Sequence, residues 1–178
     1  TVPTTGSWGR AAVPRQSAPQ DGQAFEPADT TAVTGNMPYV WQALPRVAPA
    51  PAGNPGTPEK VALGERLFFD RNLSADRQLA CASCHDLVQQ GGADGRPTSQ
   101  GIHGQVGARN APTVLNAAFQ ARLFWDGRAD SLEAQATGPL VNAVEMGMPS
   151  LDAVVARVRA DAAYAPTFRA AFGDEAPI

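Results

Sequence analysis

Apolar residues follow a helical spacing only in short stretches of this chain, and the first of these stretches begins at Thr57. Thr57 is a favourable N-cap and Pro58 suits the first helical position, so a helix is predicted to start here and to end near Asp70. Gly64 weakens this helix, because glycine in a helix interior costs about 1 kcal/mol relative to alanine. The predicted apolar face consists of Val61, Leu63, Leu67 and Phe68.

Two further helices are predicted from signals at their N-termini. Asp130 and Glu133 have the spacing of a capping box, and the helix that follows is expected to stop before Pro139. Ser150 is the predicted N-cap of the next helix. The apolar face of that helix is expected to comprise Leu151, Val154, Val155 and Val158.

A last short helix is predicted to open at Pro166 and to close at Gly173. Another short helix is expected at residues 81–85. Residues 91–112 contain six glycines and no helical period, which predicts a long loop of the kind that often carries function. No segment alternates like a strand. The predicted fold class is therefore all-α with long loops.

Residues 1–56 differ in composition from the rest of the chain. They hold nine of the sixteen prolines and no sustained apolar period, which is typical of extended, polyproline-like chain. We expect an extended Pro-rich N-terminal arm over residues 1–56 and a folded domain over residues 57–178. A plain linker and an arm that docks on a folded surface both fit this composition. The aromatic residues that could dock it are Trp8, Phe25, Tyr39 and Trp41.

The length of 178 residues favours one domain with a tail. The net charge is only −3 and Lys60 is the single lysine, so no basic cluster indicates binding to nucleic acid or to an anionic membrane surface. No apolar stretch approaches the roughly 18 residues of a transmembrane segment. There is also no intact signal peptide, and Thr1 is compatible with the start of a processed chain.

The two cysteines stand in the pattern C-x-x-C-H, formed by Cys81, Cys84 and His85. This pattern indicates covalent attachment of c-type haem, because residues three apart share a helix face and both thiols can bond one haem edge. His85 can then bind the iron. A zinc site would need two more ligands, and only His103 remains; a thioredoxin-like pair needs a βαβ context that is absent. One haem c is predicted, and with it an exported, periplasmic location, since bacteria attach haem c outside the cytoplasm.

The residue on the opposite side of the iron would decide between an electron carrier and a catalyst. His103 lies in the glycine-rich loop, whose motion could carry the imidazole to and from the iron, and we favour it for this reason. Methionine is more often a packing residue. The full set of candidates is His103, Met37, Met146 and Met148.

Several motifs, in the same order, resemble the N-terminal half of bacterial di-haem cytochrome c peroxidases, a group that includes the MauG-like enzymes. The resemblance covers about residues 57–173 and adds a cytochrome c-like haem domain to the predicted all-α class. Its motifs are LGERLFFD at 63–70, the haem motif, GARNAPT at 107–113, FWDGR at 124–128, Gln135, Gly138-Pro139 and Glu145-Met146.

The resemblance implies a peroxidatic haem in this half and a second, electron-donating haem in the other half. By the same resemblance, His103 is a distal ligand that leaves the iron on activation, and Gln135 and Glu145 handle the peroxide. Trp125 corresponds to a tryptophan between the two haems. Asn110 corresponds to a ligand of a Ca²⁺ ion at the interface of the halves.

The implied substrate is hydrogen peroxide, and the implied electron donor is a small cytochrome c or copper protein. A carboxylate such as Glu145 can move the proton that O–O cleavage requires, which is typically worth about 10²–10⁴ in rate. Gln135 can hydrogen-bond the peroxide without competing for that proton, and Trp125 offers an oxidisable ring.

The sequence departs from the family pattern in having no second C-x-x-C-H motif. We expect the second haem domain to be a separate chain, or this chain to be a fragment, or the protein to work with one haem. Two other functions remain open: a mono-haem electron-transfer cytochrome, and a MauG-like oxidant of a partner protein.

Overall fold

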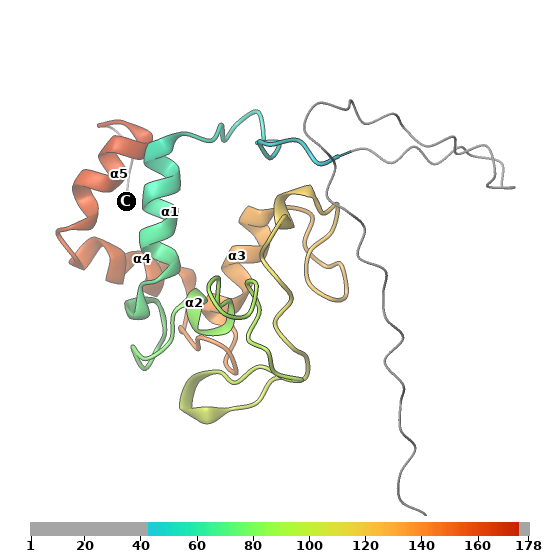
Figure 1. The fold of residues 1–178 in the computed structure, drawn as a ribbon. Coiled ribbons are helices and arrows are strands. Elements are labelled where there is room, and N and C mark those ends of the chain that lie inside the picture. The colour runs from blue at the N-terminus through green and yellow to red at the C-terminus, as the bar shows by residue number, and fades with distance from the viewer. Residues whose placement is uncertain (1–42, 175–178) are drawn as a thin grey trace, which may run out of the picture. The chain divides into compact units, whose positions relative to one another are not determined.

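A computed structural model describes residues 43–174, which form helices joined by long loops (Figure 1). No strand occurs in this range, where the only β-type pairing consists of isolated bridges. The all-α prediction is confirmed for this part of the chain, and the expected arm lies outside it up to residue 42. The helices and 3₁₀ turns are α1 (Pro58–Phe68), η1 (Arg71–Leu73), α2 (Cys81–Cys84), η2 (Ile102–Gly104), η3 (Ala117–Phe119), α3 (Leu132–Val141), α4 (Leu151–Ala160) and α5 (Tyr164–Phe172).

Helix α1 begins as the sequence predicts. The Thr57 hydroxyl accepts a hydrogen bond from the Lys60 amide at 3.2 Å, and Pro58 occupies the first turn. The predicted apolar face is only partly correct, because Leu63 is buried whereas Val61 is 68% exposed. The covered face of α1 is narrow because its main helical neighbour lies on one side of it.

That neighbour is α5, which lies alongside α1 in Figure 1. Tyr164, at the start of α5, is 1% exposed, and its hydroxyl donates to the Asp70 carboxylate at 2.7 Å. The Arg66 guanidinium lies 3.9 Å from the centre of the Tyr164 ring and pairs with Asp161 at 3.3 Å. These contacts fix the C-terminal end of α1 against the start of α5.

The main apolar core lies between α1, α4, α5 and the turn that follows α3. It includes Met146 and Met148, which are 5% and 3% exposed and therefore pack as core residues. The candidate ligand Met37 lies outside the described residues. The buried members of the core are Leu63, Leu73, Met146, Met148, Val154, Val158 and Tyr164.

Helix α3 corrects two predictions. Its N-cap is Ser131, whose hydroxyl accepts from the Ala134 amide at 3.2 Å, so the predicted capping box is placed one residue early. The helix also runs through Pro139 and ends at Val141. The extra turn is stabilised from outside the helix, because the amides of Met146 and Met148 bond the carbonyls of Pro139 and Leu140 at 3.2 and 2.9 Å.

Helix α4 begins at the predicted N-cap, with the Ser150 hydroxyl accepting from Ala153 at 3.1 Å. Val154 and Val158 are buried as expected, but Leu151 and Val155 are 43% and 37% exposed, so the covered stripe is narrower than predicted.

Helix α5 ends at the predicted Gly173, whose φ of +91° suits glycine. It starts two residues before the predicted Pro166, at Tyr164. Among the described residues that precede α1, Asn54 donates its side-chain amide to Glu133 on α3 at 2.9 Å. The side-chain oxygen of Asn54 and the Pro55 carbonyl both accept from Lys60. None of the described helices is long and apolar enough to cross a membrane.

Candidate haem site

The C-x-x-C-H motif lies on α2, a single helical turn. Its first turn is stabilised by Ser83, whose hydroxyl accepts from the Ala80 amide at 3.0 Å. Cys81 and Cys84 are three residues apart on this turn, both are half-buried, and neither forms a disulfide. Burial raises the pKa of both thiols, and for Cys84 the charges of Asp94 and Glu145 raise it further. Two unpaired thiols on one helix face fit thioether attachment of one haem.

His85 follows directly as the C-cap of α2, and its ring orientation is fixed by the backbone. Nδ1 lies 3.0 Å from the carbonyl oxygen of Gly92. Because a carbonyl only accepts, Nδ1 carries the proton and Nε2 keeps its lone pair. A histidine whose Nδ1 donates to a backbone carbonyl has its Nε2 free to bind a metal, as an axial ligand requires.

Gly92 is required at its position for two reasons. Its φ is +79°, and a Cβ there would lie 2.9 Å from the Val114 side chain. The Gly92 amide also donates to the Asp86 carbonyl at 2.7 Å, while its carbonyl accepts from the Val114 amide at 3.1 Å as well as from His85. Nothing in the spacing of His85 and Gly92 along the sequence indicates this contact.

Glu145 lies close to the haem motif. It is half-buried in the turn after α3, and the Asn142 side-chain amide donates to its carboxylate at 2.7 Å. Burial raises the pKa of Glu145, while the Arg128 charge and the Asn142 hydrogen bond lower it. The structure places Glu145 within electrostatic range of His85 and Cys84. Sequence reasoning found Glu145 but missed Asn142 and the influence of Arg128.

The glycine-rich loop is docked onto this same turn. The Ile102 amide donates to the Glu145 carbonyl at 2.9 Å, and the Gln105 side chain donates to the Ala143 carbonyl at 3.2 Å. A Cβ on Gly101 would overlap the Val144 carbonyl oxygen, so only glycine allows this close approach. The predicted long loop thus carries a fixed segment that ends in the 3₁₀ turn η2.

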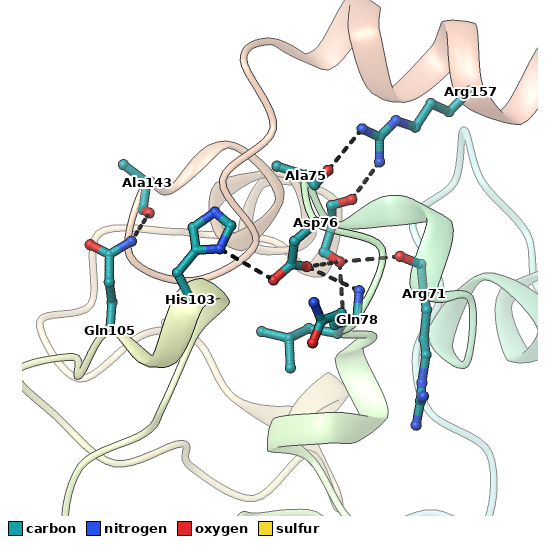
Figure 2. Close-up of polar contacts among 10 residues, drawn as sticks. Arg71, Ala75, Asp76, Gln78, His103, Gln105, Ala143 and Arg157 are labelled. Carbon is teal, nitrogen blue, oxygen red and sulfur yellow. Dashed lines mark hydrogen bonds and ion pairs between the residues drawn. The ribbon is translucent and has the colours of Figure 1, made fainter.

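His103 lies in η2 and points toward a carboxylate (Figure 2). Its Nδ1 is 3.9 Å from Asp76 Oδ2, and its side chain is 65% exposed. Its φ of +54° is left-handed and uncommon for a residue with a Cβ. No hydrogen bond or ion pair joins His103 to His85 or Glu145 within residues 43–174. A cleft of about 370 Å³ is bordered by His103, Asp76 and Cys84 together.

Trp125 and Asn110 are joined by a hydrogen bond, from the indole nitrogen to the Asn110 backbone carbonyl at 3.0 Å. Trp125 is 61% exposed. Asp126 beside it pairs with Arg109 and Arg128, at 3.1 and 2.8 Å, and hydrogen bonds from these two arginines lower its pKa to about 2. This network holds the indole in a defined orientation at the surface.

Gln135 lies half-buried on α3. Its side chain forms no hydrogen bond with any other described residue, so no polar contact links it to Glu145. Asn110 is exposed, and no group of three or more His, Cys, Asp or Glu side chains within residues 43–174 could hold a metal ion.

Comparison with known proteins gives a consistent picture. A family model described as di-haem cytochrome c peroxidase matches residues 58–178. The methylamine utilization protein MauG of Methylorubrum extorquens is 49% identical over 134 residues, which cover 75% of this chain and 37% of that protein. The cytochrome c peroxidase Ccp of Escherichia coli is 49% identical over 115 residues, which cover 65% of this chain and 24% of that protein.

Solved structures agree with these relatives. The crystal structure of a MauG-like protein associated with microbial copper homeostasis superposes with a TM-score of 0.67 at 39% identity. The superposition covers 78% of this chain and 42% of that one. The present chain thus spans well under half the length of the curated relatives it matches.

Proposed function

Since this chain belongs to the di-haem cytochrome c peroxidase family, we propose that it carries one covalent haem c and takes part in the reduction of hydrogen peroxide. Cys81 and Cys84 would form the thioethers, and His85 would bind the iron through Nε2. The observation that carries this proposal is the 3.0 Å contact of His85 Nδ1 with the Gly92 carbonyl beside a half-buried Glu145. Haem c, when bound, would supply the iron to which peroxide binds and through which electrons reach it.

In this proposal Glu145 moves the proton. Its carboxylate would accept a proton from one oxygen of hydrogen peroxide and give it to the other, so that the second oxygen can depart as water. Asn142 holds the carboxylate in place. Burial raises the pKa of Glu145, which makes its carboxylate a better proton acceptor. Gln135, whose amide has no partner among the described residues, would hydrogen-bond the peroxide. His103 would be the ligand that leaves the iron to open this site.

The electrons have to come from elsewhere, because peroxide reduction to water takes two of them. We propose a small cytochrome c or a copper protein as the donor and a second haem domain as the relay. Trp125, held at the surface through Asn110, would face that domain, and Asn110 would contribute to a Ca²⁺ site only together with it. Attachment of haem c implies a periplasmic location.

The test measures the rate at which the haem-loaded protein reacts with peroxide, monitored by stopped-flow absorption. Glu145→Gln should lower the second-order rate by about 10²–10⁴. The rate of the unaltered protein should fall as the pH drops through the pKa of Glu145, which lies above its usual value, and the variant should lack this fall. Glu59→Gln, an exposed carboxylate in the first turn of α1, is the control. A Glu145→Gln protein as fast as the control would exclude the proposed role.

A second candidate function is oxidation of a partner protein, favoured by the 49% identity with a MauG protein, the same value as with a cytochrome c peroxidase. The two functions differ in what reduces the oxidised haem. After one equivalent of peroxide, rapid reduction by a small cytochrome supports the peroxidase, whereas oxidised side chains in an added partner support the alternative.

A further inference from the structure

We propose that Asp76 is a positioning residue that holds His103 away from the haem iron. Its carboxylate gives the displaced imidazole a defined place to bind and so shifts the iron toward the open, five-coordinate state. The inference rests on the proposed function, in which His103 is the displaceable ligand, and it adds the residue that receives the ligand after it leaves.

The carboxylate of Asp76 is itself fixed. Its Oδ1 accepts hydrogen bonds from the Ser74 hydroxyl and from the Gln78 amide, both at 3.0 Å. The Ser74 hydroxyl is fully buried and also accepts from the Leu79 amide at 3.1 Å. Only 8% of the Asp76 side chain is exposed, which leaves Oδ2 as the oxygen that faces His103 (Figure 2).

The loop that carries Asp76 is anchored to the core. Arg157 on α4 donates to the carbonyls of Asn72, Ser74 and Ala75, and the Ala75 amide donates to Met146 at 2.8 Å. A carboxylate on this support has a defined place, and in the proposal the contact forms when the His103 side chain turns to it. His103 is the more exposed partner, since 65% of its side chain is exposed.

In this proposal the observed contact is the displaced position. His103 Nδ1 lies 3.9 Å from Asp76 Oδ2, and no hydrogen bond or ion pair joins His103 to His85 or Glu145 among residues 43–174. Both Asp76 and His103 nevertheless border the cleft that contains Cys84. The imidazole therefore lies at the edge of the same cleft as the haem-attaching Cys84.

The test measures the ratio of six-coordinate low-spin to five-coordinate high-spin iron by EPR and absorption, in the haem-loaded protein. Asp76→Asn retains an oxygen for the Ser74 and Gln78 bonds and places an amide toward His103. We expect this variant to raise the low-spin ratio about two- to fivefold, the effect of losing one ion pair whose histidine is open to solvent. The rise should disappear when His103→Ala is added. Thermal unfolding of each variant confirms that the protein measured is folded.

Asp161→Asn is the matched control. Asp161 Oδ1 also accepts from the amide two residues later, at 2.9 Å from Ala163, and Oδ2 also pairs with a cation, Arg66. It should leave the spin ratio unchanged.

Each other outcome is decisive. A lower low-spin ratio in Asp76→Asn would mean that Asp76 supports ligation, and an unchanged ratio would mean that it has no part; either result overturns the inference while His103 remains the ligand. If His103→Ala leaves the low-spin signal unaltered, both in the otherwise unaltered protein and in Asp76→Asn, His103 is not a ligand and the inference fails.

Discussion

At the scale of single residues, the orientation of His85 depends on the backbone carbonyl of Gly92. Substitutions at Gly91 and Gly92 should therefore differ in their effect on the haem site. Gly91 and Gly92 both have left-handed φ values, +60° and +79°. A Cβ on Gly91 would meet nothing within 4 Å, whereas one on Gly92 would press on Val114. The two positions thus separate backbone strain from steric overlap.

We predict that Gly92→Ala destabilises the protein by about 2–4 kcal/mol, because left-handed strain and overpacking add. Gly91→Ala should cost only the strain, about 1–2 kcal/mol. Urea unfolding measures both free energies. The Gly92→Ala protein should also show an altered haem absorption spectrum, since the overlap with Val114 displaces the carbonyl that accepts from His85 Nδ1. Equal losses with identical spectra would contradict the role given to Gly92.

Whether a residue of the site could be predicted from the sequence depends on how far it lies along the chain from the residues it contacts. Cys81, Cys84 and His85 could be predicted because attachment chemistry requires them to be contiguous. The contact between Asp76 and His103 could not be predicted, because it forms only when both segments dock on the turn after α3. Apolar periodicity does not indicate which distant segments of the chain pack together.

At the scale of elements, Tyr164 joins α5 to α1 through its hydrogen bond to Asp70. Burial raises the pKa of Tyr164 to about 12, with Asp70 acting in the same direction. An unfolded tyrosine ionises near pH 10, so between pH 10 and about 12 the folded state retains a proton that the unfolded state loses. The free energy of unfolding of the unaltered protein should therefore fall as pH rises through this window.

We predict that Tyr164→Phe lowers the free energy of unfolding by about 1–3 kcal/mol at neutral pH, since Asp70 loses a buried donor. The variant should also lose the part of the alkaline decline that Tyr164 causes. Urea unfolding from neutral pH to about pH 12 measures both effects. The same alkaline slope in the two proteins would show that Tyr164 does not titrate as described.

The helices themselves show what sequence signals can establish. Thr57 and Ser150 cap helices as predicted, because capping depends on the side chain and on amides three residues away. The predicted end of α3 is wrong, because a helix can continue past a proline when other groups bond the carbonyls of its last turn. The amides of Met146 and Met148 do so here, and they arrive through tertiary packing.

At the scale of the whole molecule, the apolar core is small for the length of chain it supports. Within residues 43–174, twelve apolar residues are buried, and several of them, such as Ala111 and Leu123, lie in the loops between the helices. Both thiols of the haem motif are also half-buried. A porphyrin attached there would add apolar area that the side chains do not provide, so much of the stability should depend on the cofactor.

We predict that Cys81→Ser/Cys84→Ser, which cannot attach haem covalently, loses more stability than truncation of a large core side chain, a loss of about 3–5 kcal/mol. Helices α1, α4 and α5 share a core formed by side chains alone, so far-UV circular dichroism should keep much of its helical signal. The near-UV signal, which reports fixed packing, should weaken. Thermal unfolding gives the stability, with a Cys84→Ser protein that keeps one thioether as the matched control. A double variant as stable as this control, with an unchanged near-UV spectrum, would mean that the side chains alone form a sufficient core.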